Sequence, residues 1–128
     1  MRSLPTISLA LWLAWWLALL PPAWAESVRI LVQSSPLAGS QYYTVGEFWG
    51  ELRVGDRLEL IREPDNRHDR HAIRVEWRGH KLGYVPRAEN RAVAAALDAG
   101  DKLVARISRL TEHRNPWRRV EFEVFAEL

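Results

Sequence analysis

Two stretches decide how this chain folds: Arg62-Glu-Pro-Asp-Asn-Arg-His-Asp-Arg-His-Ala-Ile-Arg-Val75, and Lys81-Leu-Gly-Tyr-Val-Pro-Arg87, which follows shortly after. In the first stretch, Ile73 and Val75 alternate with charged residues, which indicates a half-buried strand directly after a polar loop. The second stretch predicts the partner strand, so residues 72–77 and 81–85 are expected to form a hairpin around 78–80. A polar loop that is fixed by sheet at both ends is a favourable place for a binding site.

Four further stretches alternate apolar and polar residues and predict strands on either side of this hairpin. They cover residues 28–32, 57–62, 102–107 and 119–124, and the last two are joined by a loop around 115–117. Residues 42–43 fit a short extended segment or a turn, and residues 47–52 fit a short helix or an irregular segment. One main α-helix is predicted over 87–98, with Gly100 suited to its C-terminal cap. We therefore expect a mainly β fold: a small, partly open barrel of five to six strands with one main α-helix.

The first 25 residues predict a secretory signal peptide. Arg2 is followed by an apolar run from Leu9 to Leu20 and by the small-x-small ending Ala23-Trp24-Ala25. The alternative is a membrane anchor, but a helix needs about 20 apolar residues to span a bilayer and this run is shorter. We expect cleavage after Ala25 and a single domain over 26–128. The protein would then be exported, periplasmic or secreted, with no stable membrane anchor after cleavage.

The expected mature chain has nearly balanced charge and no cysteine. The sequence has 18 basic and 16 acidic residues, and removal of Arg2 leaves 17 basic residues. This balance argues against a nonspecific binder of polyanions, which usually has a clear basic excess, but it allows a local basic face. Without cysteine there is no disulfide and no thiol chemistry, so the domain relies on its core alone.

The loop and its neighbours carry the groups that an exposed single-stranded end requires. Asn66 can donate and accept through its amide, and Asp69 can accept from a hydroxyl or an amine. The candidate phosphate contacts are Arg62, Arg67 and Arg70. The candidate stacking rings are Tyr42, Tyr43 and Tyr84, and stacking is worth about 1–3 kcal/mol per base where it occurs.

This pattern resembles the HIRAN domain, a small β-rich module found alone in bacteria and fused to DNA-remodelling helicases in eukaryotes. The resemblance covers residues 29–110, roughly. It implies a curled, OB-like sheet with a helix packed at one end, related in shape to the barrels that bind single strands. In the helicase-linked members the pocket takes the 3′ end of single-stranded DNA. The resemblance therefore implies a non-catalytic module that binds such ends.

The pocket residues of the family can be carried over position by position. The aromatic pair before the first long turn falls on Tyr42 and Tyr43, the Asn and Asp of the loop fall on Asn66 and Asp69, and the later contacts fall on Tyr84 and Arg87. Two positions depart from the DNA-binding members. Gln41 replaces a basic residue before the aromatic pair, and His68 replaces a loop aromatic, although imidazole can still stack. The first departure removes an implied phosphate contact, so it predicts weaker binding or another ligand.

Several of these residues also have a purely structural interpretation. Asn66 closely follows a proline and is a common turn former, and Asp69 can cap the loop through backbone N–H groups. At least one of Tyr42 and Tyr43 can be a core aromatic. Arg87 would lie in the first turn of the predicted helix, where the helix dipole disfavours a cation, and this misfit favours a functional use.

The run His68-Asp69-Arg70-His71 raises a metal hypothesis, because two imidazoles and a carboxylate can bind zinc. The spacing does not fit a helical His-x-x-x-His pair, and another ligand would have to come from His80 or His113. We therefore expect no cofactor, with zinc at His68 and His71 as a weak alternative. The sequence shows no nucleophile elbow, phosphate loop or paired-carboxylate signature, which argues against an enzyme.

Three functions remain open from the sequence. The first is a nucleic-acid-binding module whose partner is a single-stranded end. The second is an exported domain that uses the same pocket for a peptide or an envelope protein. The third is a metal-dependent hydrolase built on His68 and His71. The family resemblance favours the first, whereas the predicted signal peptide argues against it, since an envelope protein meets little DNA except during uptake, release or biofilm growth.

Overall fold

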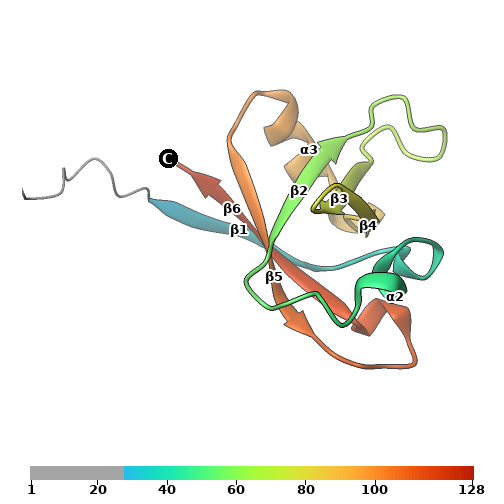
Figure 1. Ribbon diagram of the computed structural model, residues 1–128. Coiled ribbons are helices and arrows are strands. Elements are labelled where there is room, and N and C mark those ends of the chain that lie inside the picture. Colours follow the sequence, from blue (N-terminus) through green and yellow to red (C-terminus); the bar gives the residue numbers. More distant parts are fainter. Residues whose placement is uncertain (1–27) are drawn as a thin grey trace, which may run out of the picture.

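The computed structural model describes residues 28–128, and the predicted signal peptide lies outside the described residues (Figure 1). In chain order, the described elements are β1 (Arg29–Pro36), the 3₁₀ turn η2 (Ser40–Tyr42), α2 (Val45–Phe48), β2 (Arg57–Arg62), β3 (Ile73–Trp77), β4 (His80–Tyr84), η3 (Arg87–Glu89), α3 (Arg91–Asp98), β5 (Leu103–Leu110), η4 (Pro116–Arg118) and β6 (Val120–Glu127). No helix in this part of the chain is long and apolar enough to cross a membrane.

The strands form one antiparallel sheet in the order β1-β6-β5-β2-β3-β4. Just beyond β1, the chain meets the other end of this sheet, where Ala38 and Tyr84 exchange two backbone hydrogen bonds of 2.9 Å. Gly83 permits this approach, because a Cβ at that position would overlap the carbonyl oxygen of Ala38. The sheet thus curls until its ends meet at a bridge, which confirms the predicted mainly β fold with a partly open, OB-like barrel.

The core uses the alternating positions that the sequence indicates. In β3, Ile73, Val75 and Trp77 are buried while the charged residues between them lie on the other face. The buried residues of β6 are Val120, Phe122 and Val124, and those of α3 are Val93 and Ala94. One face of β3 and one face of β6 are therefore committed to the core. The loop between β2 and β3 projects beyond the end of β2 and is free to build a site (Figure 1).

Several boundaries differ from the sequence-based expectation. The helix predicted over 87–98 is divided into η3 and α3 at Asn90, whose side chain bonds to the loop instead of capping the helix. β1 extends to Pro36 because its polar half pairs with β6. β5 and β6 are also longer than predicted, since each supports the other along its length. The segment that the sequence left open contains the short helix α2.

Candidate functional site

Asn66 folds the loop between β2 and β3 onto itself. Its Oδ1 accepts hydrogen bonds from the backbone N–H groups of His68 (2.9 Å) and Asp69 (3.2 Å). Its Nδ2 donates to Glu63 Oε1 at 3.0 Å. This is the turn-forming role that the sequence suggested for Asn66. Both lone pairs of Oδ1 are used in these contacts, so the amide has one N–H left to offer a ligand.

Asp69 ties the loop to the start of α3. Its Oδ1 accepts the backbone N–H of His71 at 2.9 Å, and its Oδ2 accepts Nδ2 of the buried Asn90 at 2.7 Å. Partial burial would raise the pKa of Asp69, but these hydrogen bonds and the nearby charge of Arg87 hold that pKa below its usual value. Asp69 is therefore ionised at neutral pH, and each oxygen can accept a second hydrogen bond from a ligand.

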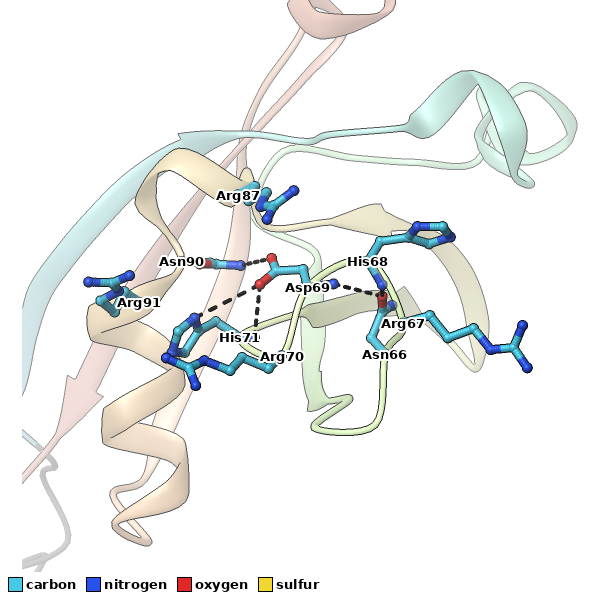
Figure 2. A pocket seen from close by; sticks show the side chains of 9 residues that line it. All are labelled: Asn66, Arg67, His68, Asp69, Arg70, His71, Arg87, Asn90 and Arg91. Atoms are coloured by element: carbon cyan, nitrogen blue, oxygen red, sulfur yellow. Dashed lines mark hydrogen bonds and ion pairs between the residues drawn. The ribbon is translucent and has the colours of Figure 1, made fainter.

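Two neighbouring hollows open around this loop. The aromatic hollow, of about 250 Å³, is lined by Ala38, Tyr43, Asn66, His68, Asp69, Ala72, Tyr84, Val85 and Arg87. The arginine hollow, of about 410 Å³, is lined by Asn66, Arg67, His68, Asp69, Arg70, His71, Arg87, Asn90 and Arg91 (Figure 2). Asn66, His68, Asp69 and Arg87 line both hollows, so the two adjoin along a shared wall.

A network of polar contacts supports the wall of the aromatic hollow. The Tyr84 hydroxyl donates to Glu63 Oε1 at 2.9 Å and accepts from Lys81 Nζ at 2.8 Å. Lys81 Nζ lies 4.3 Å from the centroid of the Tyr43 ring and 4.6 Å from that of the Tyr84 ring. The two rings meet edge to face with their centroids 6.0 Å apart. These contacts hold both tyrosines in fixed orientations.

The same contacts keep the members of this network in defined protonation states. Burial would raise the pKa of Glu63, but hydrogen bonds from Asn66, Tyr84 and Arg74 lower it. Burial would lower the pKa of Lys81, yet its contacts with Tyr84 and Tyr43 raise it. Burial raises the pKa of Tyr84, which therefore stays a protonated phenol. A charged ammonium thus lies beside the aromatic hollow at neutral pH.

Most of the predicted site residues come together in the aromatic hollow: Tyr43, Asn66, His68, Asp69, Tyr84 and Arg87 line it. The structure places Tyr42 and Arg62 in neither hollow. Tyr42 belongs to η2 and is 77% exposed. Arg62 donates to the carbonyl oxygens of Ala72 and Arg70 at 2.8 and 3.0 Å and pairs with Asp98 at 2.9 Å. Its guanidinium therefore fastens the loop and α3 to β2.

Two structural expectations are wrong. Neither Tyr42 nor Tyr43 is a core aromatic, because Tyr42 is exposed and Tyr43 is half-buried at the rim of the aromatic hollow. Arg87 does not lie in the first turn of the main helix, because η3 and Asn90 intervene before α3. The cation in the first turn of α3 is Arg91.

The two weak zinc candidates, His68 and His71, both line the arginine hollow. His71 Nδ1 lies 3.9 Å from Asp69 Oδ1. Among residues 28–128, no three or more His, Cys, Asp or Glu side chains are grouped so that they could hold a metal ion.

Sequence patterns did not predict four residues of the site: Glu63, Lys81, Asn90 and Arg91. Glu63 and Lys81 both contact the Tyr84 hydroxyl, because β2, β3 and β4 lie side by side in the sheet. Asn90 lies within the helix predicted over 87–98, and the sequence pattern did not indicate that this helix divides at Asn90. Arg91 could have been found from the sequence, since a cation in the first turn of a helix is disfavoured and therefore points to a functional use. Because the helix was expected to begin at Arg87, that argument was applied to Arg87 instead.

Comparison with known proteins gives a consistent result. The model of the HIRAN domain family matches residues 30–128. The crystal structure of a protein from Lactobacillus plantarum is similar, with a TM-score of 0.68 and 26% sequence identity, over 80% of this chain and 98% of that chain. The crystal structure of the HIRAN domain of human HLTF has a TM-score of 0.55 and 19% identity over 77% of each chain, a likeness of fold alone. No curated protein matches this chain.

Proposed function

The chain belongs to the HIRAN domain family, and on that basis we propose that it is a non-catalytic module that binds the 3′ end of single-stranded nucleic acid. The proposed site is the aromatic hollow. One observation carries the proposal: six residues singled out from the sequence, which come from three separate segments of the chain, line this one hollow. Barrels of this kind bind single strands through aromatic and basic side chains on one face.

The aromatic hollow offers a suitable contact for each part of a terminal nucleotide. The fixed rings of Tyr43 and Tyr84 offer aromatic surface to a base. The ionised Asp69 can accept a hydrogen bond from a terminal 3′-hydroxyl, whereas it would repel a 3′-phosphate. The exposed guanidinium of Arg87 can contact the phosphate of the same nucleotide.

A binding role fits these groups better than catalysis does. Asp69 has a lowered pKa, which makes it a weak general base. Tyr84 has a raised pKa and donates its proton to Glu63, which makes its oxygen a weak nucleophile. The polar groups of the aromatic hollow are therefore better suited to binding a ligand than to catalysis.

Export is part of the proposal. The pattern of Arg2, the apolar run and the Ala23-Trp24-Ala25 ending supports secretion of the protein to the periplasm or the medium. The single strands available there come from nucleic acid that is taken up, released or held in a biofilm. A peptide or an envelope protein in the same hollow is the outcome to consider if no strand binds.

Fluorescence anisotropy with a short labelled DNA strand tests the proposed function. The protein should bind a strand with a free 3′-hydroxyl more tightly than the same strand with a 3′-phosphate. Tyr43→Ala should lose about 1–3 kcal/mol of binding free energy if its ring stacks on a base. Arg87→Gln should weaken binding and reduce its dependence on salt.

The matched control is Arg109→Gln on β5, which removes the same charge outside both hollows. Its affinity should equal that of the unaltered protein, and circular dichroism should show that all variants remain folded. Equal affinity for the two kinds of 3′ end contradicts the end-binding pocket. If no strand binds at low salt, nucleic acid is not the ligand.

A further inference from the structure

The arginine hollow carries positive charge that the described contacts do not neutralise. Four of the residues that line it are arginines, Arg67, Arg70, Arg87 and Arg91, whereas Asp69 is the single acidic residue among the described lining residues. Within residues 28–128, none of the four guanidinium groups donates a hydrogen bond or forms an ion pair. Arg62 and Arg74 are different, because their guanidinium groups pair with Asp98 and Glu63.

Asp69 lies at the centre of this group and supplies one negative charge against the four arginines. Figure 2 shows its carboxylate between Arg70, His71 and Arg91 on one side and Arg67 and His68 on the other. Both carboxylate oxygens already accept hydrogen bonds, from the N–H of His71 and from the amide of Asn90. Because four arginines and one carboxylate line it, the hollow has a net positive charge.

The start of α3 adds to this charge. Asn90 is the N-cap residue, yet its side chain makes no capping hydrogen bond to the helix, and its amide N–H instead donates to Asp69. The positive end of the dipole of this eight-residue helix therefore lies at the wall of the arginine hollow. Arg91 adds a full positive charge in the same turn. A bound anion would offset both charges.

We propose that the arginine hollow binds a backbone phosphate of the strand whose 3′ end lies in the aromatic hollow. This assignment rests on the proposed function. The shared wall of the two hollows gives the strand a continuous path from one to the other, past Asp69 and Arg87. Arg70 and Arg91 line the arginine hollow and not the aromatic one, so they report on this second contact alone.

The slope of affinity against salt concentration measures this contact. For single strands, each phosphate contact contributes about 0.7 to the slope of log K against log salt. Arg70→Gln and Arg91→Gln should each make the slope shallower, by up to about 0.7 for the one phosphate, whereas the control Arg109→Gln should not. Arg91→Lys keeps the charge and should keep the slope. All variants should retain the preference for a free 3′-hydroxyl, because the aromatic hollow is unchanged.

A strand with neutral methylphosphonate linkages provides the second measurement. Arg91→Gln should not weaken the binding of this strand, because the charge that Arg91 contacts is absent. If Arg91→Gln binds the methylphosphonate strand more weakly than the unaltered protein does, the proposal is overturned. The proposal is also overturned if, with an ordinary strand, the salt slopes of Arg70→Gln and Arg91→Gln equal that of Arg109→Gln. In either case the preference for a free 3′-hydroxyl still stands as evidence for the proposed function. If the unaltered protein lacks that preference, the proposed function fails, and this assignment fails with it.

Discussion

At the residue scale, Glu63 organises the site without lining either hollow. It accepts hydrogen bonds from Asn66 in the loop, from Tyr84 on β4 and from Arg74 on β3. These contacts hold the loop against Tyr84, which lines the aromatic hollow. The position of the proposed ligand contacts therefore depends on one carboxylate that the ligand itself does not touch.

Glu63→Gln should lower the free energy of unfolding at pH 7 by about 1–3 kcal/mol, because hydrogen bonds to a charged carboxylate are lost or weakened. The pKa of Glu63 is lowered in the folded protein, so its ionised form favours the folded state above the ordinary pKa of 4.5. That stability is lost as the pH falls from 4.5 through the folded pKa. The difference between the two proteins should accordingly shrink below that pH.

Urea unfolding at steps from neutral to acid pH measures this difference. Asp69 also has a lowered pKa, but it is present in both proteins and cancels in the comparison. If the gap between the two proteins is constant across the series, the carboxylate of Glu63 is not the source of the stability.

Asn66 and Asp69 show how much of the site the sequence could predict. Their residue types predicted both a turn-forming role and a ligand contact, and the structure confirms the first through backbone N–H groups. The ligand contact stays a prediction. Removal of either side chain would release the loop as well as any ligand. Tyr43 and Arg87 are therefore better positions at which to test binding.

At the scale of the elements, the sequence predicted what depends on local pattern. The hairpin of β3 and β4 follows from apolar alternation around Gly79, and both strands lie close to their expected positions. The contact between Ala38 and Tyr84 could not be predicted in this way, because it joins residues far apart in the chain. Barrel closure, and with it the place of Tyr43 beside Tyr84, depends on this long-range contact.

Gly83→Ala should disrupt this closure. A methyl group at Gly83 would overlap the carbonyl oxygen of Ala38 and contact the side chain of Leu37. The backbones would have to separate, at a cost of about 1–3 kcal/mol in the free energy of unfolding. Gly46→Ala is the matched control, because a Cβ there has nothing within 4 Å and alanine favours the helix α2.

Thermal unfolding of the two variants compares these sites. Gly46→Ala should unfold at the same temperature as the unaltered protein or above it, and Gly83→Ala should unfold at a lower temperature. A Gly83→Ala protein as stable as the Gly46→Ala protein would show that the close approach of Ala38 does not matter for stability.

At the scale of the whole molecule, the domain expected from the sequence contains every described element. β1 begins at Arg29, after the expected cleavage site at Ala25, and β6 ends at Glu127. Removal of residues 1–25 would therefore take away no residue of a described strand. The described residues that line both hollows also lie beyond this segment.

Production of the complete chain in a bacterium with a secretion pathway tests the export proposal. Mass spectrometry of the exported protein should show an N-terminus at Glu26, because signal peptidase requires small residues at the positions occupied by Ala23 and Ala25. Ala25→Leu should block this cleavage and leave the uncleaved chain attached to the membrane through its apolar run. Full-length protein in the cytoplasmic fraction would contradict the proposal, and the relevant single strands would then be those inside the cell.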